Sequence, residues 1–294
     1  MGPPEVFDPL AAPARPPTPR ARGSDPVPAP HTPYRRPFSR TDEASGLGRE
    51  NEGAGGFGPR RGRACGDRMI RMRIGILGTG HVGRTLASAW SRTGHDVVLG
   101  SRRPRDPALL AELDEVVAEG IRVEDPSAAA EHADVLVNAT PGTASVALLD
   151  RIGAPALAGK VLLDVAVGFR EDGAPSHPVV SLGEEIQRAF PDARVVKTFS
   201  TVDRGVMVAP DSLDGPSNVF LSGEDADAKK VVRGLLADLG WSEEAVLDLG
   251  GISTARGQEL FADLFIAIAG ATGTYEFGIR VVLPAARESG PTGV

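Results

Sequence analysis

Cysteine is almost absent from this sequence, because its 294 residues include only Cys65. A single thiol excludes both a disulfide framework within the chain and a metal site built from several cysteines. No histidine has a second ligand at metal-binding spacing either, so we predict no metal site. This cysteine usage fits a reducing compartment, and we expect a cytoplasmic protein.

Long apolar runs are absent as well. No stretch approaches the roughly 18 to 20 uncharged residues of a membrane-spanning helix, and the N-terminus lacks the apolar stretch of a secretion signal. Hydrophobic residues still make up 41% of the chain, which is enough for a sizeable buried core. We therefore expect a globular protein that does not bind membranes.

An excess of positive charge is missing from most of the chain. Residues 1–68 carry 11 of the 32 Lys and Arg residues and 8 of the 39 Asp and Glu residues. Residues 69–294 therefore hold 21 basic and 31 acidic residues, a net charge of −10. Such a surface is unfavourable for general nucleic-acid binding, so we expect no nucleic acid among the partners.

Residues 1–68 are predicted to form a disordered extension. Of the 25 prolines, 13 lie before residue 60, mixed with Arg, Ala, Gly and Ser. Such a composition buries too little apolar surface to offset the entropy of ordering. The segment is either a dispensable extension or a basic tail that docks on an anionic partner. Because Met69 stands just before the first expected strand, Met1 and Met69 are both candidate translation starts.

From Arg73 onwards, short β-branched runs alternate with helical segments, which is typical of a parallel sheet with crossover helices. Each expected strand is a nearly unbroken apolar run, as in a sheet that is covered on both faces. The pattern predicts a Rossmann-type α/β domain in residues 69–202, with a doubly wound, mostly parallel sheet. The expected strands are 73–77, 96–100, 121–124, 134–139, 160–166 and 194–200, and the expected helices are 82–93, one after Pro107, 143–152 and 182–190.

Residues 203–294 are expected to form a small, largely helical C-terminal portion. The expected elements are strands at 218–223 and 245–250, an amphipathic helix at 225–240 and a long helix at about 253–275. One face of the long helix is too apolar for solvent. This face should pack on the Rossmann domain, alone or together with a second subunit, and consists of Leu260, Phe261, Leu264, Phe265, Ile268 and Ala269.

The GTGHVG motif, Gly78 to Gly83, follows the first expected strand directly and opens an amphipathic helix. This context indicates a turn that binds the phosphates of a dinucleotide. Gly78 permits the tight turn, Gly80 lets the backbone approach the pyrophosphate, and Gly83 allows close helix–strand packing. Backbone N–H groups at the helix start would face the phosphates. The alternative is a glycine turn that holds no ligand.

The end of the second expected strand indicates which dinucleotide binds. An NAD-specific site has an Asp or Glu there, about 20 residues after the glycines. This chain has Ser101, Arg102 and Arg103 instead. A hydroxyl and two guanidinium groups can bind the dianionic 2′-phosphate through charge-assisted bonds. The sequence therefore predicts NADP(H), and the alternative is a solvated basic turn.

The loops after the first, fourth, fifth and sixth strands should line the cleft at the carboxyl edge of the sheet. Thr140 and Pro141 are the expected floor beneath the nicotinamide, and residues from Ala166 to Gly168 are the expected backbone edge. These residues are small and leave room for a ring. Hydride transfer requires alignment of two rings more than an acid or a base, so we expect no catalytic triad.

Lys197 is the only candidate for a catalytic side chain. A cation there could stabilise the negative charge that develops on a reduced flavin or deazaflavin. The alternative is a buried lysine at a strand end, paired with Asp164 or Asp203. Besides His81, the expected folded part contains three histidines. We predict that all three lie at the surface, and they are His95, His132 and His177.

The stretch RIGILGTGHVGRTLASAWSRTGHDVVLGSRRP, which begins at Arg73, resembles the start of the coenzyme F420-dependent NADP oxidoreductase family. Later stretches look like further landmarks of that family, namely SLGEEIQRAFPDARVVKTFST, SGEDADAKKVV and TGTYEFGIRVV. The resemblance covers roughly residues 73–283. It implies hydride transfer between C4 of the nicotinamide and C5 of a deazaflavin. It also implies a homodimer in which a small C-terminal portion covers the cleft.

By this resemblance the pyrophosphate would be cradled by Gly78, Thr79, Gly80, His81 and Val82. The adenosine 2′-phosphate would be held by Ser101, Arg102 and Arg103. Two loops depart from the best-known archaeal members. Residues 138–142 stand where those members have a Trp-containing loop, and their histidine after the sixth strand is replaced within residues 197–201. These loops shape the pocket of the hydride acceptor. The resemblance therefore supports NADP(H) binding more strongly than it supports a particular acceptor.

The sequence thus predicts an NADP(H)-dependent oxidoreductase whose small-molecule co-substrate is coenzyme F420 or a flavin-like carrier. A non-catalytic NADP(H)-binding redox sensor is the alternative from another class, because a fold does not determine a function. A reductase of imines or small ketones is a third hypothesis. It requires a proton donor in the cleft, and Lys197 is the only candidate for that role.

Overall fold

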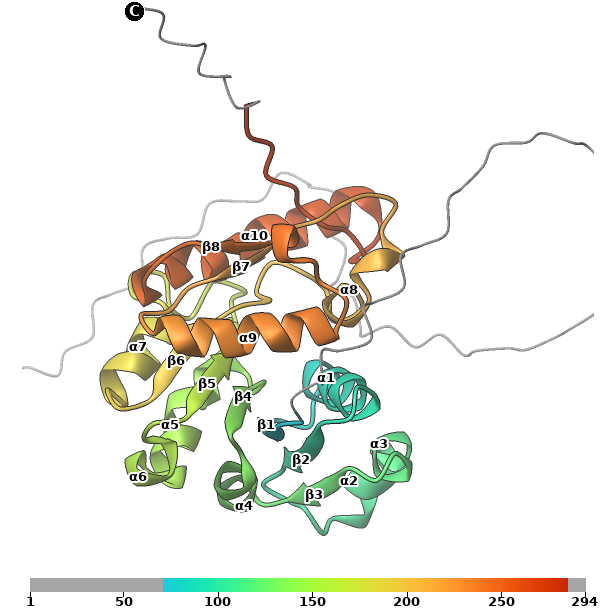
Figure 1. Ribbon diagram of the computed structural model, residues 1–294, viewed down its shortest axis with the longest axis vertical. Coiled ribbons are helices and arrows are strands. Elements are labelled where there is room, and N and C mark those ends of the chain that lie inside the picture. The colour runs from blue at the N-terminus through green and yellow to red at the C-terminus, as the bar shows by residue number, and fades with distance from the viewer. Residues whose placement is uncertain (1–70, 285–294) are drawn as a thin grey trace, which may run out of the picture. The chain divides into compact units, whose positions relative to one another are not determined.

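Six parallel strands form the central sheet of residues 71–284, which are the residues that the computed structural model describes (Figure 1). The strand order is β3-β2-β1-β4-β5-β6, so the direction of winding reverses between β1 and β4. This is the order of a doubly wound dinucleotide-binding fold, and the predicted Rossmann-type sheet is confirmed. The strands are β1 (Arg73–Leu77), β2 (Asp96–Gly100), β3 (Arg122–Glu124), β4 (Val135–Asn138), β5 (Val161–Asp164) and β6 (Arg194–Lys197).

The predictions made for residues 1–68, and for Met69 as a translation start, lie outside the described residues. Residues 71–284 belong to one compact unit.

Helices cover both faces of the sheet, and each face has its own hydrophobic core. Trp90 and Leu86 lie in the core of the first face, which is covered by α1 (His81–Arg92), α2 (Pro107–Glu112), α3 (Asp114–Ala118), α8 (Arg204–Val208) and α9 (Ala226–Asp238). Leu149 and Ile186 lie in the core of the second face, which is covered by α4 (Pro126–His132), α5 (Gly142–Ile152), α6 (Ala154–Leu157), α7 (Leu182–Ala189) and α10 (Ala255–Thr272).

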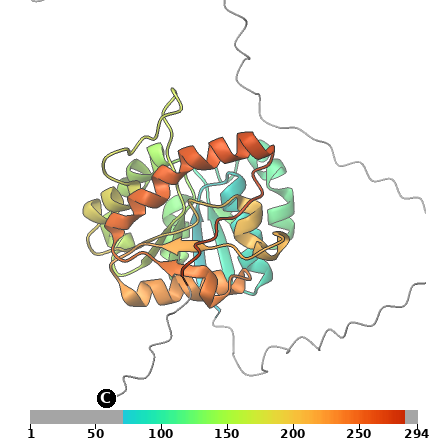
Figure 2. The ribbon, with the colours of Figure 1, turned by 90° about the horizontal axis from the view of Figure 1, so that it is seen from above.

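The C-terminal segment packs on both faces. Figure 2 shows α9 (orange) and α10 (red) on opposite sides of the strands, in agreement with the two cores. The indole N–H of Trp90 in α1 donates to the carbonyl of Leu235 in α9 at 3.2 Å. Strands β7 (Val219–Leu221) and β8 (Val246–Asp248) form a separate parallel pair, joined to β6 by a bridge between Lys197 and Ser222. The segment is completed by three 3-10 turns, η1 (Pro210–Ser212), η2 (Glu243–Ala245) and η3 (Ile252–Thr254).

Several elements differ from the expectations in length or number. Most expected strands are shorter in the structure by one to three residues at an end. The helix after Pro107 is broken at Leu113 into α2 and α3, and the long C-terminal helix begins only after η3. Helix α4 was not anticipated, although Asp125 caps it and Pro126 opens it. That Asp-Pro pair is a helix start signal that the sequence offered.

His95 corrects one sequence prediction. It was read as a surface residue, but it is buried, with 5% of its surface exposed. Its ring accepts from the backbone N–H of Met72 at 3.2 Å and lies 3.1 Å from the carboxylate of Asp238. A buried histidine with a partner for each ring nitrogen is satisfied, so its polarity does not force it to the surface.

The buried face of α10 also differs from the prediction. Leu264 is 54% exposed, whereas Gln258 and Glu259 are buried. Periodicity identifies apolar stripes, but it cannot see that two polar side chains have partners in distant elements. Within residues 71–284, no helix combines the length and apolar character that crossing a membrane requires.

Candidate dinucleotide-binding site

A cavity of about 740 Å³ opens at the carboxyl edge of the sheet. Its lining includes residues that directly follow the strands, such as Gly78 after β1, Ser101 after β2, Ala139 after β4 and Val165 after β5. The cavity therefore lies where the strand order reverses, which is where open α/β sheets bind ligands. It brings together the predicted site residues Gly78, Thr79, Gly80, His81, Val82, Ser101, Arg102, Arg103, Thr140, Pro141 and Ala166. Gly83 and Lys197 do not line it.

The geometry explains in a different way why glycine stands at each of the three glycine positions of the GTGHVG turn. Gly78 has a φ of +115°, and a Cβ there would lie 2.5 Å from the carbonyl oxygen of Ala139. A Cβ on Gly83 would lie 2.1 Å from the carbonyl oxygen of Gly78, so α1 can approach the turn only with glycine at this position. Gly80 lines the cavity, and a Cβ on it would meet no protein atom within 4 Å. A ligand can thus approach the backbone of Gly80 closely.

The N-terminus of α1 faces the cavity without a protein anion. No side chain caps it, and its first turn contains no acidic residue. His81 and Val82, the first two residues of α1, line the cavity. Uncapped N–H groups and the helix dipole together favour an anion at this point. The turn therefore offers N–H donors and a positive helix end to an anionic group in the cavity.

The basic cluster after β2 lies beside this turn. Ser101 is buried, and its hydroxyl accepts from the backbone N–H of Arg103 at 3.0 Å. The guanidinium of Arg103 pairs with Asp106 at 2.8 Å, and Asp106 also caps α2, so this arginine has an anchored partner. The side chains of Arg102 and Arg103 are exposed at the cavity rim.

Arg151 adds a third cation that the sequence analysis did not single out. It lies at the end of α5, whose cavity face also includes Ala144, Ala147 and Leu148. These four residues recur at three- and four-residue spacing, a signal that becomes readable once the start of α5 is known. No Asp or Glu is among the residues that line the cavity, so the lining is cationic and selects for anions.

The other end of the cavity is formed by the loops after β4, β5 and β6. The backbone N–H of Gly142 donates to the carbonyl of Val167 at 3.2 Å, which holds the first two loops together. Phe199 has a φ of +64°, an uncommon backbone conformation for a residue with a Cβ. It packs against Trp241. The lining at this end is mostly apolar and is contributed by Pro141, Val165, Ala166, Val167, Phe199, Val202 and Met207.

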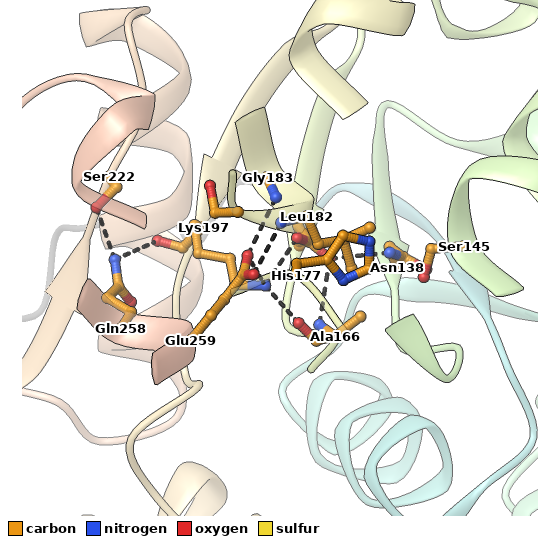
Figure 3. Close-up of polar contacts among 12 residues, drawn as sticks. Asn138, Ser145, Ala166, His177, Leu182, Gly183, Lys197, Ser222, Gln258 and Glu259 are labelled. Carbon is orange, nitrogen blue, oxygen red and sulfur yellow. Dashed lines mark hydrogen bonds and ion pairs between the residues drawn. The ribbon is translucent and has the colours of Figure 1, made fainter. Parts of the chain in front are cut away.

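Lys197 lies behind this wall rather than in the cavity. It is fully buried, and its ammonium lies 2.9 Å from Asp164 and 2.9 Å from Glu259 (Figure 3). Burial lowers the pKa of this ammonium, but the two carboxylates outweigh burial and hold the pKa above its ordinary value. The geometry therefore favours the alternative interpretation, a buried lysine paired with Asp164. The second carboxylate partner of Lys197 is Glu259, which the sequence analysis did not name, rather than Asp203.

The structure also bears on metal binding. Among residues 71–284, no group of three or more His, Cys, Asp or Glu side chains is placed to hold a metal ion.

The sheet order, the glycine turn and the cationic cavity together define a Rossmann-type, dinucleotide-binding fold. A solved structure from Arthrobacter sp. FB24, provisionally described as an F420-dependent NADP reductase, shares 41% sequence identity. The match covers 72% of this chain and 100% of that chain, with a TM-score of 0.67. The sequence profile of the family "NADP oxidoreductase coenzyme F420-dependent" matches residues 73–168. This chain belongs to that family, and it is an NADP(H)-binding member of it.

Two further similarities are more distant. Metalloreductase STEAP3 of Rattus norvegicus is 30% identical over 185 residues, which are 63% of this chain but 35% of the rat protein. The match thus spans about a third of the length of that relative. An imine reductase from Aspergillus terreus, in a complex with NADPH4, is 20% identical with a TM-score of 0.50. That match covers 69% of this chain and 63% of the other, and it shows a shared fold alone.

Proposed function

We propose that the protein is an NADP(H)-dependent oxidoreductase that transfers a hydride between the nicotinamide and a deazaflavin or flavin-like carrier. The observation that carries this proposal is the division of one cavity into two ends. One end combines an uncapped helix N-terminus with exposed arginines, and the other end is mostly apolar. NADP(H) matches this division, because its phosphates are anionic and its nicotinamide ring, at the terminus away from the 2′-phosphate, is flat.

The cationic end supports the choice of NADP(H) over NAD(H). Arg102 and Arg103 line the cavity beside the buried Ser101, and no carboxylate lines it. A carboxylate at this place would accept hydrogen bonds from a ribose hydroxyl but would repel a 2′-phosphate. We therefore assign the 2′-phosphate to the Ser101–Arg103 cluster and the pyrophosphate to the GTGHVG turn.

The apolar end supports a hydride acceptor that needs no proton from a side chain. No lysine, tyrosine or carboxylate is among the lining residues, and the ammonium of Lys197 is held by two carboxylates outside the cavity. A bound NADPH would supply a hydride from C4 and become NADP⁺, and a deazaflavin would gain that hydride at C5 together with a proton from solvent. Thr140, Pro141, Ala166 and Val167 would hold the nicotinamide face and exclude water. Imine or ketone reduction would favour a proton donor at this end.

We further propose that the protein is a cytoplasmic homodimer that uses the C-terminal half of α10. Leu264 and Ile266 on this helix are 54% and 48% exposed, and Tyr275 after it is 56% exposed. Exposed apolar side chains that gather on one element are typical of interaction surfaces. Met207, from the expected C-terminal portion, lines the cavity and supports a role for this portion near the acceptor.

An anaerobic assay panel tests the proposed activity. The protein is mixed with NADPH and, in separate reactions, with oxidised coenzyme F420, FMN, FAD, a cyclic imine or a small ketone, and the loss of the NADPH absorbance is followed. We expect turnover with F420 or a flavin. Turnover with the imine or the ketone alone would overturn the proposed acceptor class. If a protein that binds NADPH turns over none of the five compounds, a redox sensor is favoured.

A further inference from the structure

The last residues of three neighbouring strands form a buried polar row. Asn138 ends β4, Asp164 ends β5 and Lys197 ends β6, and the strand register places them directly beside one another. All three side chains are fully buried. The remaining residues of β4 and β5 are all apolar. Three polar groups at such positions are costly unless they satisfy one another. Their partners connect the cavity wall to the C-terminal helix.

At the cavity side, the row holds two loops in place. The amide of Asn138 donates to Asp164 at 2.8 Å, and the hydroxyl of Thr140 donates to the amide oxygen of Asn138 at 2.6 Å. The backbone N–H of Ala166 donates to the same Asp164 oxygen at 3.2 Å. Thr140 and Ala166 both line the apolar end of the cavity. The row therefore fixes the wall on which the nicotinamide would rest.

Lys197 joins this wall to α10. Its ammonium bonds to the carboxylate of Asp164, to the carbonyl of Ala166 and to the carboxylate of Glu259, so its three donors have three acceptors (Figure 3). The two carboxylates lie at 2.9 Å each. A fully paired buried cation tolerates little displacement, because moving any partner leaves a charge without compensation.

Glu259 anchors the row on two elements. It belongs to α10, and its carboxylate also accepts from the backbone N–H groups of Leu182 at 2.8 Å and Gly183 at 3.1 Å. These groups open α7, so the positive N-terminus of that helix adds to the charge of Lys197. The neighbouring Gln258 donates to the hydroxyl of Ser222 at 2.7 Å. The position of α10 is thus tied to the cavity wall through buried charges.

We propose that Lys197 and Glu259 are positioning residues, which hold the wall of Thr140 and Ala166 in the geometry that hydride transfer requires. The rate consequence rests on the proposed function, whereas the effect on the bound nicotinamide rests only on the proposed placement of NADPH in the cavity. NADPH affinity should depend little on this row, because the glycine turn and the Ser101–Arg103 cluster contact the opposite end of the ligand. The row acts on alignment, which sets the rate of transfer between two rings.

The substitution Glu259→Gln tests this role. It keeps the shape of the side chain and leaves Lys197 with Asp164 as its buried carboxylate partner, while the new amide N–H2 faces donors that Glu259 accepts from, so the tie between the row and α7 is weakened. His95→Asn is the matched control, because it removes a buried contact to Asp238 from the other half of the molecule, away from the cavity lining. Glu259→Asp is a second variant that keeps the charge with a shorter reach, and it serves if the Gln variant does not fold.

Two readouts separate positioning from stability. The first is the emission of bound NADPH, which reports the surroundings of the nicotinamide and needs no acceptor. The second is kcat with the acceptor found in the panel, together with the isotope effect for NADPH deuterated at the transferred position. For Glu259→Gln we expect changed emission, kcat lower by about 10- to 100-fold, a larger isotope effect and a Kd for NADPH within about threefold of the wild type. Glu259→Asp should lie between, and His95→Asn should lose thermal stability alone.

Unchanged emission and kcat in a folded Glu259 variant, or the same changes in His95→Asn, would overturn the positioning role. If the wild-type protein turns over no acceptor, the proposed function fails, but bound NADPH emission still decides on the row. The two failures are therefore distinguishable.

Discussion

At the residue scale, the binding cavity depends on side chains that are absent as much as on those that are present. Gly78 and Gly83 leave no space for a Cβ, and Gly80 leaves its space open toward the cavity. Arg102 and Arg103 lie at the rim of the same cavity, Arg103 pairs with Asp106, and no carboxylate is among the lining residues. Two predictions follow directly from these local geometries, one on nucleotide choice and one on helix packing.

Replacing Arg102 and Arg103 together with alanine should weaken NADPH binding at least about 100-fold, because each hydrogen bond to a charged group contributes about 1.5–3 kcal/mol. Binding of NADH, which lacks the 2′-phosphate, should change little. Fluorescence titration of both nucleotides gives the two values of Kd. The exposed Arg105, which does not line the cavity, provides the control variant Arg105→Ala. Equal losses for NADPH and NADH would contradict the assignment of the 2′-phosphate.

Gly83→Ala should destabilise the protein by about 1–3 kcal/mol, because the added Cβ would lie 2.1 Å from a backbone carbonyl oxygen. Gly234→Ala is its matched control in another helix. A Cβ at Gly234 meets no atom within 4 Å, so this change should stabilise by about 0.5–1 kcal/mol. Urea unfolding of both variants measures the difference. A stable Gly83→Ala protein would mean that α1 does not pack this closely on the turn.

At the element scale, the sheet was predictable because each strand is an apolar run with a fixed place in an alternating pattern. The cavity residues followed from the same pattern, since strand ends converge at one edge. Glu259 could not be found in this way, because it lies 62 residues from Lys197 along the chain. Only packing of α10 against α7 brings them together. Arg151 was missed although its helix was expected, because the spacing of Ala144, Ala147, Leu148 and Arg151 does not by itself show that this helix face lines the cavity.

The small sheet of β7 and β8 offers a pH test at this scale. Burial raises the pKa of Asp248, but Lys229, at 2.9 Å, and the N–H of Gly250 outweigh it and lower that pKa overall. Asp248→Asn should therefore cost stability at neutral pH, by less than about 1 kcal/mol because the pair is partly exposed. The cost should shrink below about pH 3.9, the pKa of aspartate in an unfolded chain, and vanish as the pH falls through the lower folded value. Urea unfolding at neutral and acidic pH measures it, and a pH-independent cost would contradict the ion pair.

At the scale of the whole molecule, both faces of the sheet depend on the C-terminal segment. Helix α9 closes one core and α10 contributes to the other, so the cavity and the exposed apolar side chains of α10 belong to one compact unit. Loss of α10 from its place would remove Glu259 from Lys197. A dimer formed through α10 would therefore use a helix that also contacts the cavity wall through Glu259 and Lys197.

The substitutions Leu264→Glu and Ile266→Glu, made together, should convert a dimer to a monomer, because charges would replace exposed apolar side chains on α10. Sedimentation velocity at micromolar concentrations measures the change. Val179→Glu alters an exposed apolar side chain in the loop between β5 and α7 and should leave the dimer intact. A wild-type protein that is monomeric at these concentrations would contradict the proposed dimer.

The most direct test of the proposed function follows the hydride itself. The protein is mixed anaerobically with NADPH that carries deuterium at the transferred C4 position and with oxidised coenzyme F420, FMN or FAD, and the reduced carrier is analysed by mass spectrometry. We expect deuterium at C5 of the deazaflavin, where a C–D bond retains it, with much slower transfer from the corresponding NADH. Deuterium at N5 of a flavin exchanges with water, so reduction of FMN or FAD is followed instead by the loss of the oxidised flavin's absorbance and by its isotope effect. No deuterium in the deazaflavin and no reduction of FMN or FAD, in a protein that binds NADPH, would contradict hydride transfer to a deazaflavin or flavin-like acceptor.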